Sequence, residues 1–77
     1  MVEQEIRDLI ARHYKRARLL DVDADLDDTI SLNVVGVRKE CLAKRLLDKF
    51  KDIHWIRFVG GWNTSIYSRE TLKWMGV

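Results

Sequence analysis

Apolar residues recur at three- and four-residue steps through the first twenty residues of the chain. This spacing places them on one face of a helix, and the acidic residues at its start and basic residues near its end suit the helix dipole. The pattern predicts an amphipathic helix over about residues 3–20, with an apolar stripe of Ile6, Leu9, Ile10, His13, Ala17 and Leu20. On this stripe, we expect His13 to be a buried or half-buried structural residue.

Polar and apolar residues alternate from Thr29 to Val35, which is the period of a strand, and Gly36 ends that run. The aspartate-rich segment before it, residues 21–28, is expected to be a solvated connection. From Val37 to about Lys51 the period becomes helical, with an apolar face of Leu42, Ala43, Leu46, Leu47 and Phe50.

Two runs rich in β-branched and aromatic residues, 53–59 and 62–68, flank Gly60-Gly61. A glycine pair suits a two-residue turn with positive φ, so we expect a hairpin in which Arg57 faces Thr64. The face that carries Trp55, Trp62, Ile53 and Ile66 is richer in large apolar groups, and we assign it to the core.

Ser68 is a suitable N-cap for a short closing helix over about residues 69–75, which Gly76 ends. Together the segments predict one small α+β domain over residues 1–77, in the order α-β-α-β-β-α. Its three-stranded sheet has helices packed on one side, and its first two strands run parallel through a right-handed crossover. A four-helix arrangement is the alternative if the strands do not form.

Composition favours a protein of a reducing compartment. Cys41 is the only cysteine among 77 residues, so no disulfide is expected, and we place its side chain in the core. The chain lacks an apolar run of the ~20 residues that a membrane span needs, and its first residues lack signal-peptide features. We therefore expect a cytoplasmic protein without a membrane partner.

Charge is segregated along the chain although the net charge is only +2. Residues 21–35 carry five aspartates and no cation, whereas residues 36–77 carry nine cations and four acids. A cationic half of this kind favours a polyanionic partner, most simply nucleic acid.

The cationic half contains the candidate anion-binding residues. Gly36-Val-Arg-Lys39 lies where a strand turns into a helix, and a helix N-terminus offers unpaired amide donors to an anion. The helix continues the basic character, so the predicted set is Gly36, Arg38, Lys39, Lys44, Arg45, Lys49 and, from the hairpin, Arg57. The alternative is that these side chains form a solvated face. No nucleotide-binding glycine loop is present.

Aromatic side chains of the hairpin are candidate contacts to bases. A sheet that displays aromatic residues is one way in which single strands are held. On the face assigned to solvent these residues are His54, Phe58 and Tyr67, with Arg57 as a neighbouring cation from the opposite edge.

A calcium site and a catalytic site both lack support. Asp21, Asp23 and Asp25 match the first ligand positions of an EF-hand loop, but Leu26 replaces its glycine and Leu32 its final glutamate. No nucleophile, base or metal constellation is present, so we expect no cofactor, no metal and no enzyme.

The amphipathic first helix, the acidic loop and the helix from about residue 36 resemble an acyl carrier protein over about half of the chain. Such carriers bear their prosthetic arm on a serine in Asp-Ser-Leu at the start of that helix. Asn33-Val-Val-Gly36-Val37 stands there in this chain, with no serine. An acyl-carrier-like helical domain is therefore a third alternative without the group that carries the arm.

The leading hypothesis is a non-catalytic module that docks nucleic acid through its basic second helix and the outer face of the hairpin. The rival is a protein–protein interaction module, an inhibitor, adaptor or subunit, whose hairpin edge at Ile66 and Tyr67 adds to a partner's sheet or to its own copy.

Overall fold

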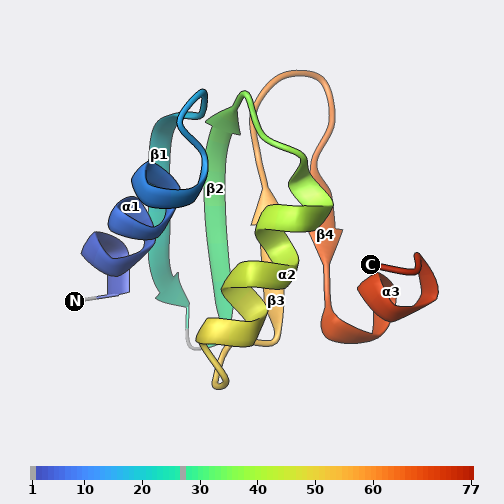
Figure 1. The fold of residues 1–77 in the computed structure, drawn as a ribbon. Helices are drawn as coiled ribbons and strands as arrows, with labels where there is room; N and C mark the ends of the chain where they lie inside the picture. Colours follow the sequence, from blue (N-terminus) through green and yellow to red (C-terminus); the bar gives the residue numbers. More distant parts are fainter. Residues whose placement is uncertain (1, 27) are drawn as a thin grey trace.

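The computed structural model describes residues 2–26 and 28–77, without the side chains of residues 25 and 26. Within this part the chain forms α1 (Val2–His13), β1 (Arg18–Leu26), β2 (Thr29–Val35), α2 (Lys39–Lys49), β3 (Trp55–Phe58), β4 (Ser65–Tyr67) and α3 (Arg69–Trp74) (Figure 1). The fold is α+β as predicted, with a sheet of four strands instead of three.

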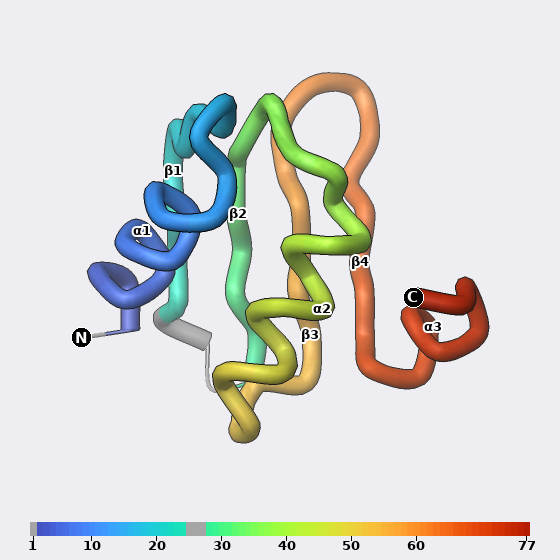
Figure 2. Tube along the Cα trace, viewed as in Figure 1, coloured from blue at the N-terminus to red at the C-terminus, as the bar shows by residue number. Residues whose placement is uncertain are grey.

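The strands lie in sequence order, β1-β2-β3-β4. The outer pairs are antiparallel, whereas β2 and β3 run parallel and are joined by α2, which confirms the predicted crossover. Helices α1 and α2 lie beside each other over one face of the sheet (Figures 1 and 2). The sheet excludes both the four-helix alternative and the acyl-carrier-like arrangement.

The core lies between this face and the two helices. Alternation along β2 buries Ile30, Leu32 and Val34, and β3 adds Ile56 and Phe58. Burying one such side chain stabilises the fold by about 1.5–3 kcal/mol. The helices contribute the three- and four-residue stripes that the sequence indicates, Ile6, Leu9 and Ile10 from α1 and Leu42, Ala43, Leu46 and Leu47 from α2.

The first helix is shorter than predicted. It ends at His13, and Arg18–Leu26 forms the edge strand β1, where the sequence indicated first a helix and then a solvated loop. Pairing with β2 overrides the helical period, because Val22 opposite Leu32 is buried in the same core. Asp21 and Asp23 therefore lie in a strand and not in an EF-hand-like loop, and Asp27 lies outside the described residues.

Both glycines of the hairpin have positive φ, as predicted. The connection between the strands is longer than predicted, and the face of the hairpin that was predicted to be exposed is the buried one. Arg57 pairs with Ile66, so residues 59–64 form the loop instead of a two-residue turn. Parallel pairing places Phe58 next to Leu32, on the helix side. Phe58 is consequently 2% exposed, whereas Trp55 is 44% exposed and Trp62 100%. The assignment of the two tryptophans to the core was wrong.

Both of the other helices begin and end close to the predicted positions. The Ser68 hydroxyl accepts a hydrogen bond from the Thr71 amide at 3.1 Å, which caps α3, and Gly76 follows the helix at φ +78°. Helix α3 packs against the end of α2, where Arg69 Nη2 donates to the Leu47 carbonyl oxygen at 2.7 Å. None of the described helices has the length and apolar content needed to cross a membrane.

Candidate nucleic-acid interface

Three cations of α2, Lys44, Arg45 and Lys49, lie on the side of the helix that faces away from the sheet. Because successive residues of a helix are about 100° apart, the stripe that buries Leu42 and Leu46 leaves Lys44, Arg45 and Lys49 exposed. Cys41 shares this outer side and is exposed, so the prediction that it belongs to the core was wrong.

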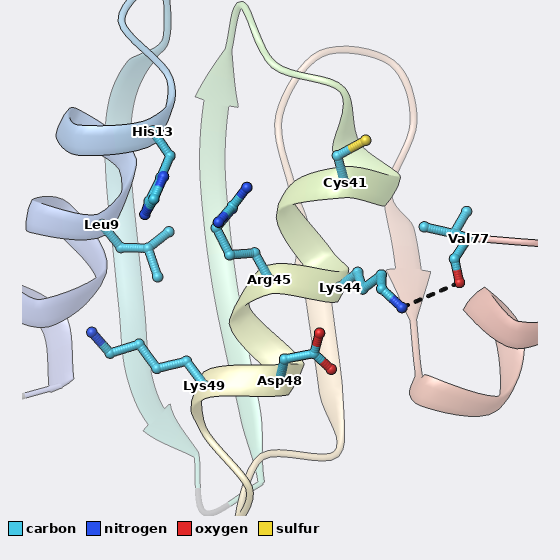
Figure 3. Close-up of a pocket in the computed structure, with 8 residues that line it drawn as sticks. All are labelled: Leu9, His13, Cys41, Lys44, Arg45, Asp48, Lys49 and Val77. Carbon is cyan, nitrogen blue, oxygen red and sulfur yellow. Dashed lines mark hydrogen bonds between the residues drawn. The ribbon is translucent and has the colours of Figure 1, made fainter.

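These cations border a shallow hollow between α1 and α2, with a volume of about 600 Å³ (Figure 3). Figure 3 shows that Arg45 and Lys49 extend from α2 toward α1, whereas Lys44 turns the other way. The Lys44 amino group lies 3.4 Å from the carbonyl oxygen of Val77. The lining residues are Leu9, His13, Cys41, Lys44, Arg45, Asp48, Lys49 and Val77.

Arg45 is held at the hollow by Tyr14, which follows α1. Its Nε donates to the Tyr14 hydroxyl at 3.3 Å, and its Cζ lies 5.8 Å from the centre of the Tyr14 ring. The Lys49 amino group lies 5.8 Å from the centre of the Phe50 ring. Among the described side chains no carboxylate forms an ion pair with either cation, so their charge is available to a ligand.

His13 lies in the last turn of α1 and points into the hollow (Figure 3). The prediction of a buried structural histidine was wrong, because α1 ends there and leaves the ring exposed. Desolvation and then the nearby charges of Arg45, Arg12 and Lys49 lower the pKa of His13 below its usual 6.5. Cations from both helices therefore act on the same small volume.

The segment between β2 and α2, residues 36–39, is less available to an anion than its sequence indicates. Gly36 has φ +79°, and a Cβ added there would clash with the Arg16 carbonyl oxygen, so glycine is needed to let the two turns pack closely. The Lys39 amino group lies 6.0 Å from the centre of the Phe58 ring, on the side of α2 away from the hollow. Arg38 is exposed at the N-cap position of α2 and makes no side-chain cap.

Arg57 does not join the cations of α2. It alternates with the buried Ile56 and Phe58, so it lies on the face of the sheet opposite the helices. The predicted single surface, with Arg57 beside the basic helix, is therefore divided between two faces of the molecule.

The three predicted aromatic contacts have different environments. His54 is exposed just before β3. Tyr67 is half-buried, and its hydroxyl donates to Glu40 at 3.4 Å. Phe58 is buried because it faces α2, so it cannot stack on a base and its assignment as a contact was wrong.

Sequence reasoning missed the contribution of α1. His13 lines the hollow from that helix, and Arg12 lies near enough to lower the pKa of its ring. Both lie in the last turn of α1, a position that the longer helix predicted over residues 3–20 did not indicate. The one signal in the sequence that the first helix ends before Leu20 is the alternation of apolar and acidic residues that begins there.

Comparison with protein-family models, with curated proteins and with solved structures finds no match to this chain. Within residues 2–26 and 28–77, no group of three or more histidine, cysteine or acidic side chains is arranged to hold a metal ion.

Proposed function

We propose that this chain is a non-catalytic module that docks nucleic acid in the hollow between α1 and α2. The supporting observation is that Arg45 and Lys49 of α2 line the same hollow as His13 of α1 and, with Arg12, act on its ring, without a carboxylate ion pair to either α2 cation among the described side chains. A phosphodiester backbone supplies the negative charges that this arrangement lacks. Asp48 is the one carboxylate among the lining residues.

The two flanking cations extend the surface along α2. Lys44 lines the same hollow and Arg38 is exposed at the beginning of the helix, so a strand that continues beyond Arg45 and Lys49 along α2 would meet these charges. Contacts to phosphate are independent of sequence. We therefore expect weak binding, with Kd on the order of 1–100 μM at physiological salt.

The test is fluorescence anisotropy with labelled duplex and single-stranded oligonucleotides at two salt concentrations. About three phosphate contacts predict a slope of log K against log salt of roughly −2 to −3. The double variant Arg45→Glu/Lys49→Glu is expected to weaken binding at least tenfold, since each charge reversal replaces a phosphate contact by a repulsion.

Arg57→Glu is the matched control, because it makes the same charge reversal at an exposed position on the opposite face of the sheet. It is expected to change the affinity much less than Arg45→Glu alone. Equal losses from the two single variants, or no micromolar binding at low salt, would refute the proposed interface.

A second candidate function is protein–protein interaction through the hairpin edge. Strand β4 is a terminal strand of the sheet, and Ile66 on it is 54% exposed. An exposed edge strand can accept a further strand from a partner or from a second copy. This function predicts a concentration-dependent dimer in light scattering that Ile66→Lys abolishes and Lys44→Glu leaves unchanged.

A further inference from the structure

A second hollow lies on the other side of the molecule, where β4 turns into α3. Its volume is about 400 Å³, and it is lined by Trp55, Ser68, Glu70, Thr71, Trp74 and Met75. Trp74 is 85% exposed, and Trp55 comes from the uncovered face of the sheet. Tryptophan is usually well buried in small domains, so two exposed tryptophans that line one hollow require an explanation.

The polar groups of this hollow differ in whether they are free to bind a ligand. The hydroxyls of Ser68 and Thr71 lie 3.0 Å apart, and Ser68 also caps α3. The carboxylate of Glu70, in contrast, forms no hydrogen bond or ion pair with any described residue. Two indole rings and one unpaired carboxylate are the groups that recognise an organic cation, because a cation is attracted to the face of an indole ring.

The chain's own cations leave these rings uncovered. None of the described lysines or arginines makes a cation–π contact with Trp55 or Trp74. Arg69, next to Glu70, turns away and donates to backbone carbonyl oxygens at the end of α2. Arg57 lines a different hollow, which shares Trp55 with this one.

We infer that the hollow formed by Trp55, Glu70 and Trp74 binds the cationic side chain, an arginine or lysine, of a partner peptide. Charge complementarity selects this occupant, since Glu70 provides the negative charge and the indole rings the π-faces. Met75 adds a soft apolar side to the same hollow. The site is independent of the proposed nucleic-acid interface, because it shares no residue with it.

The test is an NMR titration of the full chain with short peptides, observing the indole N–H signals. The probes are Ac-Gly-Ser-Arg-Ser-Gly-amide, its lysine counterpart and a control with norleucine, which has the four-carbon chain of lysine without the ammonium group. The arginine and lysine peptides are expected to shift the signals of Trp55 and Trp74, with Kd on the order of 1 mM. The signal of Trp62, which does not line the hollow, is expected to stay in place and serves as the internal control.

Variants then separate the contributions. Trp74→Leu and Glu70→Gln are each expected to weaken binding by about three- to tenfold, and both positions are exposed enough to be changed without loss of the fold. Arg57→Gln is expected to preserve or strengthen binding. Equal binding of the norleucine peptide would show a merely apolar hollow and overturn the inference. Failure of the cationic peptides to shift either indole signal at tens of millimolar would also overturn it.

Discussion

A small group of side chains around Phe58 joins three elements of this domain. The rings of Phe58 and Tyr67 meet edge to face, with centres 5.7 Å apart and planes at 78°. Lys39 from α2 covers the Phe58 ring, and the Tyr67 hydroxyl donates to Glu40 of the same helix. Desolvation and the charge of Glu40 raise the pKa of Tyr67 above its usual value, so the hydroxyl keeps its proton for this hydrogen bond at neutral pH.

The first prediction contrasts Phe58 with Trp62. Phe58→Ala is expected to lower the free energy of unfolding by about 3–5 kcal/mol, a large share of the roughly 4–12 kcal/mol typical of a chain of this length. Trp62→Ala, at a fully exposed position, is expected to change it by about 0.5 kcal/mol or less. Urea unfolding measures both values.

A milder variant keeps this prediction testable if Phe58→Ala does not fold. Phe58→Leu is expected to cost about 1.5 kcal/mol or less, because it nearly preserves the buried volume. A larger loss of stability for Trp62→Ala than for Phe58→Leu would contradict the assignment of faces in the hairpin.

The alternation in the hairpin shows what the sequence can and cannot determine at this scale. It correctly separates Trp55 and Arg57 from Ile56 and Phe58, since neighbouring residues of a strand face opposite sides. It does not indicate which side is buried. Pairing with β2 decides that, and it places Ile56 and Phe58 inside and the tryptophans outside.

At the scale of elements, the proposed interface depends on α1 and α2 lying side by side over the sheet. The sequence predicts α2 and its outward cations well, because its apolar stripe is complete. The end of α1 could not be located from its period alone, since the stripe continues by coincidence through Ala17 and Leu20 into β1. The hollow between the two helices follows from tertiary packing and was therefore not predictable.

The second prediction concerns the pH dependence of the interface. The pKa of His13 is lowered below 6.5, so the folded chain resists its protonation. The stability that this histidine contributes is present above that pH and declines as the pH falls through 6.5 toward the lower folded pKa. A bound phosphate backbone favours the protonated ring, so nucleic-acid affinity is expected to rise as the pH falls over the same window.

Anisotropy titrations between about pH 7.5 and 5.5 measure this effect. Protonation of His13 adds one positive charge at the hollow, and its attraction to a phosphate in water is expected to increase the affinity by about fivefold or less. His13→Gln is expected to remove this increase, and His54→Gln, before β3, to retain it. If the affinity of His13→Gln still rises as the pH falls, His13 is not part of the binding site.

At the scale of the whole molecule, the sheet separates two surfaces of different chemistry. The helix side carries Arg45 and Lys49, whereas the opposite side carries Trp55 and Arg57. Substitutions on opposite faces of the sheet, at residues with no shared partners, are expected to contribute nearly additively to free energies.

The third prediction is that the two proposed sites respond independently to mutation. Trp74→Leu is expected to leave the oligonucleotide Kd within about twofold of its original value, and Arg45→Glu to leave the peptide-induced indole shifts unchanged. Anisotropy and NMR titrations on both variants check this. A loss of both activities in either variant, with the fold intact, would indicate one shared surface instead of two.

The two borders of the sheet are not equivalent. Strand β1 has irregular register against β2 and carries Asp21 and Asp23, features that discourage a further strand from joining that side. The short β4 is the side left open to an incoming strand. A chain with a single receptive border can close into a two-fold pair but cannot propagate head to tail, since an open filament needs two complementary surfaces. If β4 pairs with a second copy, as the second candidate function proposes, the acidic strand limits the assembly to a finite one.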